Sequence, residues 1–161
     1  MSAWLVGLDV DGTILLQDET MSPGVPEAVA RLRDAGHEVT IATGRSWMAT
    51  RRWVEQLELT AEFVVCSNGA VTMRRVGDDW ERWHVETFDP APVLALLRDR
   101  LPEARYMVEL GDGKRLYTEH LDDWTLEGGR QVDFDELAAE PVSRVVVVSP
   151  GHDEDDFHRL V

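Results

Sequence analysis

The stretch GLDVDGTILL, residues 7–16, places Asp9 and Asp11 two positions apart, directly after an apolar run that begins at Trp4. A short continuous apolar run of this kind is typical of a strand that is covered on both faces. Two carboxylates this close repel each other, and removing water from either one costs free energy. A cation or a phosphoryl group would offset that cost, so we expect the rest of the chain to supply the other parts of such a site.

Two further apolar segments repeat the pattern of a short strand that ends in polar residues. After the first strand at 4–8, EVTIA at 38–42 predicts a second strand and FVVC at 63–66 predicts a third. Segments with helical spacing of apolar residues separate the three strands. Because this order is typical of a parallel sheet with crossover helices, the sequence predicts an α/β fold of the doubly wound class.

Capping residues predict where the two helices begin and end. Ser22 is placed as the N-cap of the first helix, with Pro23 at the first helical position and Gly36 as the C-terminal cap. The alternative is a later start, to which Pro26 points. Ser46 is placed as the N-cap of the second helix. The polar residues 17–21 predict a loop or flap between the first strand and the first helix.

The pattern changes after Ala70, where closely spaced strands and turns replace the alternation of strand and helix. Glycine–aspartate turns between apolar segments are typical of hairpins, and an aspartate followed by proline is typical of a helix start. The predicted elements are a hairpin of 71–76 with 80–88, a helix from 89 to 101, a hairpin of 106–110 with 115–118, a strand at 145–148 and a helix from 153 onward.

Composition and charge exclude several classes of partner. The 161 residues carry a formal net charge of −15, which repels nucleic-acid backbones and anionic membrane surfaces, so neither is expected as a partner. No apolar stretch approaches the length of a membrane span, and the first residues lack the pattern of a signal peptide. The single cysteine, Cys66, cannot form an internal disulfide, so we expect a cytoplasmic protein.

Polar, glycine-containing turns follow all three predicted core strands, at residues 9–13, 43–45 and 67–69. In an open parallel sheet, ligands bind beyond the carboxyl ends of the strands, so these turns are expected to converge. Together they hold two carboxylates, hydroxyl groups, an amide, an arginine and backbone N–H groups. These are the parts that phosphoryl transfer requires: an oxygen nucleophile, a cation site and donors for the phosphate oxygens.

The motifs DVDGT at 9–13, TGR at 43–45 and SNGA at 67–70 resemble those of the haloacid dehalogenase superfamily. The likeness is greatest to its Cof-like phosphatases, which carry an α/β cap after the third core strand. It covers residues 3–70 with specific motifs, and residues 71–161 only by the order of elements. The resemblance implies a Rossmann-like core over 1–83 and an α+β cap region over 84–161 that is incomplete.

The resemblance also implies roles for individual residues. Asp9 would be the nucleophile that forms an aspartyl-phosphate, and Asp11 the general acid and then the general base. Mg²⁺ would bind the Asp9 carboxylate and the Asp11 backbone carbonyl. The Thr43 hydroxyl and the Gly44 amide would hold the phosphoryl group. The full set of substrate-binding residues that it implies is Gly12, Thr43, Gly44, Arg45 and Asn68.

The function that follows is a magnesium-dependent phosphatase acting on a small phosphorylated metabolite such as a sugar phosphate. Two alternatives stay open. In one, the chain is a catalytically incomplete or regulatory module that uses the same fold only for binding. In the other, a phosphomutase, the phosphoryl group passes from the aspartate to a second hydroxyl of the sugar instead of to water.

Two expected parts of the family's site are missing from the first half of the chain, namely a core lysine and further acids for Mg²⁺. The single lysine, Lys114, follows a Gly-Asp-Gly turn in the second half. Either the chain is the N-terminal part of a longer phosphatase that ends inside the cap, or it is a compact relative. In the compact reading, 145–148 is the fourth core strand, Lys114 is the core lysine and the late acids are Asp153, Asp155 and Asp156.

The position of Lys114 in a turn favours the first interpretation, the N-terminal part. A core cut short would leave apolar strands uncovered, so this interpretation also predicts an exposed apolar surface and self-association. Elution as a monomer in size-exclusion chromatography would contradict the predicted self-association.

Overall fold

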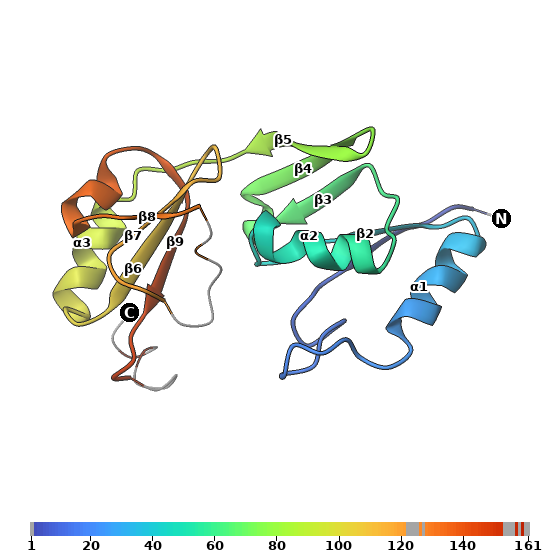
Figure 1. The fold of residues 1–161 in the computed structure, drawn as a ribbon, viewed down its shortest axis with the longest axis horizontal. Helices are drawn as coiled ribbons and strands as arrows, with labels where there is room; N and C mark the ends of the chain where they lie inside the picture. Colours follow the sequence, from blue (N-terminus) through green and yellow to red (C-terminus); the bar gives the residue numbers. More distant parts are fainter. Residues whose placement is uncertain (1, 122–125, 127, 153–156, 158, 160–161) are drawn as a thin grey trace. The chain divides into compact units, whose positions relative to one another are not determined.

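The computed structural model describes residues 2–121, 126, 128–152, 157 and 159. The chain divides into two compact units, Met1–Val85 and Glu86–Val161, whereas the sequence places the boundary between residues 83 and 84. Figure 1 draws the first unit in blue through green and the second in yellow through red. Each unit has its own buried core, so each is described by itself.

The first unit begins with the predicted alternation of strands and helices. Its elements are β1 (Leu5–Leu8), α1 (Val25–Asp34), β2 (Glu38–Ile41), α2 (Trp47–Gln56) and β3 (Phe63–Cys66). β1 and β2 pair in parallel, with each residue of β1 opposite one residue of β2. The α/β class and the order of these five elements are therefore confirmed.

β3 lies parallel to β2 on the side away from β1. A parallel bridge joins Ala42 to Val65, and the Thr40 hydroxyl donates a hydrogen bond to the Phe63 carbonyl. A 3₁₀ turn (Ser67–Gly69) then reverses the chain into β4 (Val71–Val76). The carboxyl ends of β1, β2 and β3 consequently lie at the same edge of the unit.

β4 pairs antiparallel with β3, and β5 (Asp79–Val85) pairs antiparallel with β4. The tight connection contains Gly77 at φ 63°, a left-handed conformation that glycine adopts without steric cost. The predicted hairpin is confirmed, although its second strand ends at Val85 and not at residue 88. The sheet is therefore mixed: parallel where the polar strand ends meet, antiparallel beyond β3.

The expectation that β1 is covered on both faces is wrong for the part of the chain that the structure describes. Leu5 is 67% exposed, as is Trp4, whereas Val6 and Leu8 on the other face of β1 pack against the core. The well-buried residues lie just after the strand, at Val10, Ile14 and Leu15, because the chain turns back there into the core. Whether copies of the chain associate through the exposed apolar residues stays a prediction.

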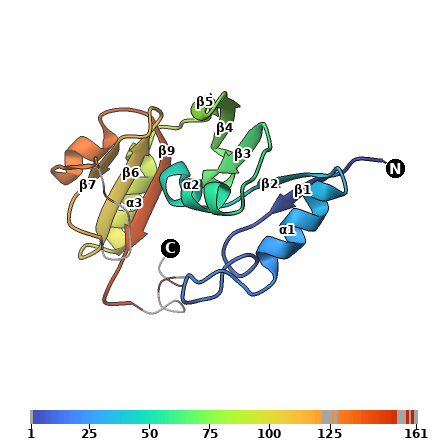
Figure 2. The ribbon, with the colours of Figure 1, turned by 45° about the vertical axis from the view of Figure 1, so that its right-hand side comes forward.

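One predicted helix start is wrong and the other is confirmed. α1 does not begin at Ser22: its N-cap is Gly24 at φ 84°, and Pro26 lies in the first turn, where a missing N–H leaves no bond unmade. α2 has Ser46 as its N-cap, and the Ser46 side chain accepts a hydrogen bond from the Ala49 N–H. Figure 2 shows α1 running alongside β1 and β2.

The second unit is an antiparallel hairpin extended on both sides and covered by a helix. Its elements are α3 (Ala91–Arg100), β6 (Arg105–Leu110), β7 (Arg115–Tyr117), β8 (Arg130–Gln131) and β9 (Val142–Val148). The strands lie in the order β8-β7-β6-β9, and α3 lies beside this sheet (Figures 1 and 2). Leu94 and Leu97 of α3 are buried in the core of the unit. A 3₁₀ segment (Phe134–Ala138) precedes the last strand.

The placement of β9 excludes the compact interpretation. β9 pairs antiparallel with β6 in the sheet of the second unit, so it is not a fourth strand of the first unit's sheet. Lys114 lies in the turn between β6 and β7, where its ammonium group pairs with Asp112 at 2.6 Å. The late acids of that interpretation, Asp153, Asp155 and Asp156, lie outside the described residues, as does most of the helix predicted from 153 onward.

Buried charge also holds the second unit together. Glu109, 1% exposed, faces Arg115 at 3.7 Å and Arg144 at 3.5 Å. A carboxylate and guanidinium groups at such depth stabilise the fold only while they stay together, because each one alone would be a desolvated charge. Among the described residues, no helix is long and apolar enough to span a membrane.

Candidate active site

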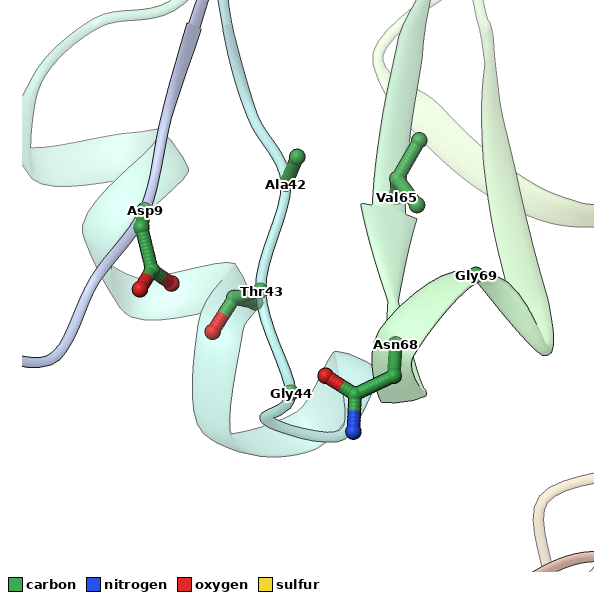
Figure 3. Close-up of a pocket in the computed structure, with 7 residues that line it drawn as sticks. All are labelled: Asp9, Ala42, Thr43, Gly44, Val65, Asn68 and Gly69. Atoms are coloured by element: carbon green, nitrogen blue, oxygen red, sulfur yellow. The ribbon is translucent and has the colours of Figure 1, made fainter.

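A pocket of about 350 Å³ lies where the three parallel strands of the first unit end (Figure 3). Asp9 follows β1, Thr43 and Gly44 follow β2, and Asn68 follows β3. The lining is completed by Ala42, Val65 and Gly69. The structure therefore brings together four of the seven residues that the sequence singles out, Asp9, Thr43, Gly44 and Asn68.

Thr43 is held between β2 and β3 by its backbone. Its N–H donates to the Val65 carbonyl at 3.0 Å, and its carbonyl accepts from the Asn68 N–H at 3.1 Å. The buried side-chain oxygen accepts a hydrogen bond from the Arg45 N–H at 3.1 Å. Since that oxygen is acting as an acceptor, the hydroxyl hydrogen is left to donate to a ligand in the pocket.

The loop after β3 holds Asn68 against the loop after β2. Ser67 and Asn68 both have left-handed backbones, at φ 51° and 54°, a conformation that costs a residue with a side chain about 1 kcal/mol or more. A Cβ atom on Gly44 would lie 2.9 Å from the Asn68 side-chain oxygen, and Figure 3 shows that oxygen directed toward Gly44. Only glycine at position 44 permits this approach.

Asp9 presents its carboxylate at the start of a tight turn. One carboxylate oxygen accepts a hydrogen bond from the Val10 N–H at 2.7 Å. The Val10 carbonyl accepts from the N–H groups of Ile14 and Leu15, which closes the turn. Gly12, at φ 71°, makes the reversal possible, but it does not line the pocket.

Asp11 and Arg45 bind each other instead of lining the pocket. The Arg45 Nε atom lies 2.9 Å from Asp11 Oδ2, and Nη2 lies 2.6 Å from Oδ1, so the contact is bidentate. The hydrogen bonds from Arg45 lower the pKa of Asp11, against a smaller opposing effect of burial. The Asp11 side chain is 61% exposed, so much of this interaction is weakened by solvent.

The sequence did not single out two further charged residues beside this pair. Glu19 accepts a hydrogen bond from Arg45 Nη2 at 2.8 Å and another from Arg52 Nη2 at 3.1 Å. Glu19 lies in the segment read only as a polar flap, and Arg52 lies within α2. No local pattern signals the contact, because it joins residues 33 positions apart.

The oxygen atoms at this edge of the sheet are of the chemical type that binds a magnesium ion. Mg²⁺ prefers oxygen ligands and is commonly held by one or two carboxylates together with waters and substrate phosphate. The Asp9 carboxylate and the Asp11 backbone carbonyl, the two groups that the sequence singles out for Mg²⁺, are oxygen atoms of this kind. The described part of the chain contains no group of three or more histidine, cysteine, aspartate or glutamate side chains that could hold a metal ion.

Comparison with known proteins agrees with the strand-end motifs. A 5-amino-6-(5-phospho-D-ribitylamino)uracil phosphatase of Bacillus subtilis, YitU, is 40% identical over 81 residues, which is 50% of this chain and 30% of that protein. The pyridoxal phosphate phosphatase YbhA of Escherichia coli is 34% identical over 98 residues, 61% of this chain and 34% of that protein. The matched part thus spans about a third of these curated relatives.

Similarity of fold extends over the whole chain. A crystal structure of a haloacid dehalogenase-like hydrolase from Bacteroides thetaiotaomicron superimposes with a TM-score of 0.70 at 18% identity, covering 99% of this chain and 62% of that one. The family model that matches the sequence, described as haloacid dehalogenase-like hydrolase, covers residues 6–131. That range is well over half of the 161 residues, so the chain belongs to the haloacid dehalogenase-like hydrolases.

Proposed function

We propose that this chain carries the nucleophile half of a phosphoric monoester hydrolase, with Asp9 as the nucleophile. The observation that carries the proposal is the pocket itself. It places a carboxylate, a hydroxyl group that is free to donate and an amide side chain around one space at the ends of three strands. Such an arrangement suits attack on phosphorus while donors hold the other phosphate oxygens.

The reaction proceeds in two steps. In the first, an Asp9 carboxylate oxygen bonds to phosphorus and the bond from phosphorus to the ester oxygen breaks. Asp11 gives the ester oxygen a proton, which it must first take up against the effect of Arg45 on its pKa. In the second, water attacks the aspartyl-phosphate, Asp11 takes a proton from it, and inorganic phosphate leaves with Asp9 restored. The Thr43 hydroxyl, the Gly44 N–H and the Asn68 side chain orient the phosphoryl group throughout.

Magnesium belongs to the proposal as the cofactor, held by the Asp9 carboxylate and the Asp11 backbone carbonyl. When bound, it supplies positive charge that reduces repulsion between the carboxylates and the phosphoryl oxygens.

The substrate class is a small phosphorylated metabolite. The curated relatives are named for two such compounds, a phosphoribitylamino-uracil and pyridoxal phosphate. The pocket volume of about 350 Å³ lies at the small end of the range for small-molecule sites. A sugar phosphate is the specific example that we propose, and a cytoplasmic location accords with a single, buried cysteine, Cys66, that forms no disulfide.

Release of inorganic phosphate from p-nitrophenyl phosphate tests the proposal, measured with Mg²⁺ and with EDTA. Because the first unit supplies the nucleophile but contains no lysine, we expect slow turnover that depends on the metal and is lost in Asp9→Asn. Asp89→Asn is the matched control, because it makes the same change at an exposed carboxylate of the second unit. Turnover that survives in Asp9→Asn would overturn the role of Asp9.

A second candidate function is a binding module on the same fold. It is favoured by the position of Lys114, the single lysine of the sequence, which lies in the turn between β6 and β7 and pairs there with Asp112. Under this alternative the chain binds inorganic phosphate in the pocket but shows no turnover above Asp9→Asn.

A further inference from the structure

The Glu19 carboxylate bridges two guanidinium groups beside the pocket. Its Oε1 atom accepts from Arg45 at 2.8 Å and its Oε2 atom accepts from Arg52 at 3.1 Å. Each oxygen therefore serves one arginine. Two oxygens of a phosphate group or of a foreign carboxylate present acceptors in the same way, and arginine pairs of this kind are typical binding sites for such groups.

Glu19 reaches the two arginines from the tip of a tight turn. The Leu16 N–H donates to the Thr20 carbonyl, the Glu19 N–H donates to the Leu16 carbonyl, and Leu15 bridges Met21. Glu19 itself has φ 60°, a left-handed conformation that a residue with a long side chain seldom adopts. The turn thus holds a strained residue whose side chain meets two arginines.

We propose that Arg45 and Arg52 form an anion subsite, that Glu19 occupies it in the free protein, and that a second anionic group of the substrate replaces Glu19 there. The inference rests on the proposed phosphatase function for its link to a substrate. It adds that the favoured substrates carry a carboxylate or a further phosphate in addition to the phosphoryl group that is transferred.

The exposure of the contacts makes Glu19 replaceable. The Glu19 side chain is 56% exposed and that of Arg52 is 55% exposed, and ion pairs in water contribute little to stability. The Arg45 side chain is only 17% exposed, and its bidentate contact with Asp11 keeps its guanidinium in place when Glu19 leaves. Glu19 is therefore the partner that moves away, and the Arg45 guanidinium stays in place to bind the anionic group of the substrate.

The same helix offers a matched control. Arg51 and Glu55 form an ion pair at 2.7 Å along α2, with side chains 54% and 58% exposed. The residue types and exposure are those of the Arg52–Glu19 pair, but Glu55 contacts one arginine four positions away and does not bridge two. A general effect of surface charge would act on both pairs alike.

The test is an NMR titration of the arginine Nε–H signals with sodium phosphate at low salt, in the wild type, Glu19→Gln and Glu55→Gln. We expect the Arg45 and Arg52 signals to respond, with a dissociation constant two- to fivefold lower in Glu19→Gln, the factor expected from losing an exposed competing charge. Glu55→Gln should match the wild type. A dissociation constant unchanged by Glu19→Gln, or an Arg51 response equal to that of Arg52, would overturn the proposal.

Two further readouts keep the inference separate from the proposed function. The backbone N–H signals of Gly44 and Gly69 report phosphate in the pocket. If these two signals do not shift, the result contradicts the phosphatase site, while shifts of the arginine signals still test the anion subsite. A titration with sodium acetate distinguishes the two anions. A response to acetate at the same two arginines assigns a carboxylate, and a response to phosphate alone assigns a second phosphate.

Discussion

Replacing Gly44 by alanine probes the close approach between the loops that follow β2 and β3. A Cβ atom at this position would lie 2.9 Å from Asn68 Oδ1 and 3.5 Å from its Cγ and Nδ2 atoms. Ordinary contact begins at 3.4 Å, so the oxygen must retreat by about 0.5 Å. The backbone of Gly44 is not in the left-handed region, so alanine itself brings no conformational strain.

We therefore expect stability and ligand binding to change separately. Alanine in place of glycine stabilises by about 0.4–1 kcal/mol through the unfolded chain, which offsets the small cost of moving Asn68. The free energy of unfolding should change by less than about 1 kcal/mol. Binding of inorganic phosphate should weaken about tenfold, because a displaced Asn68 loses a hydrogen bond to a charged group that contributes about 1.5 kcal/mol.

Urea unfolding and an NMR titration with phosphate, followed at the Gly69 N–H, measure the two quantities. Gly7→Ala is the matched control, because a Cβ there meets nothing within 4 Å. In an Asn68→Ala background, Gly44→Ala should add no further loss of binding. Equal losses in both backgrounds, or unchanged binding in Gly44→Ala alone, would refute the reasoning.

Three other outcomes follow from particular contacts. Glu109→Gln leaves two largely buried arginines without their common carboxylate, so urea unfolding should show a loss of about 3–5 kcal/mol. Ser46→Ala removes the N-cap of α2 and should cost about 1 kcal/mol in the same measurement. Hydrogen bonds from Arg45 and then Arg52 lower the pKa of Glu19, so its small contribution to stability is present above its ordinary pKa and is lost as pH falls through the lowered one. A carboxyl-carbon NMR titration should find this lowered pKa in the wild type and a higher one in Arg52→Gln.

Local sequence patterns predicted the first unit well, because its strands, helices and turns are each specified by residues that are close together in the sequence. Each of the first three strands is a short apolar run, and each ends in a turn with its own motif. Ser46 was identified as a helix cap because a serine before a helical pattern commonly accepts a hydrogen bond from the first turn, as Ser46 does from the Ala49 N–H. The placement of the first helix cap at Ser22 was wrong, because Pro26 and the left-handed Gly24 move the start of α1 further along the chain.

The sequence could not indicate which sheet a late strand joins or which side chains of distant loops contact each other. A strand such as Val142–Val148 has the same apolar pattern whichever sheet it joins, and its partner β6 is decided by packing within the second unit. The exposure of Leu5 depends likewise on what packs against its face of β1 and not on the residues of β1.

By itself, the sequence determined the α/β class, the order of the first elements and the polar residues that end each strand, because the period of apolar residues and the turn-forming glycines are local properties. It also predicted that these strand ends converge, as they do around Asp9, Thr43 and Asn68. Only the tertiary structure decided that Asp11 pairs with Arg45 beside the pocket instead of lining it. It also decided that Glu19 joins Arg45 and Arg52. Contacts between charged side chains from separate loops depend on how the strands pair and on the direction of the turns. A local sequence pattern contains no information about either.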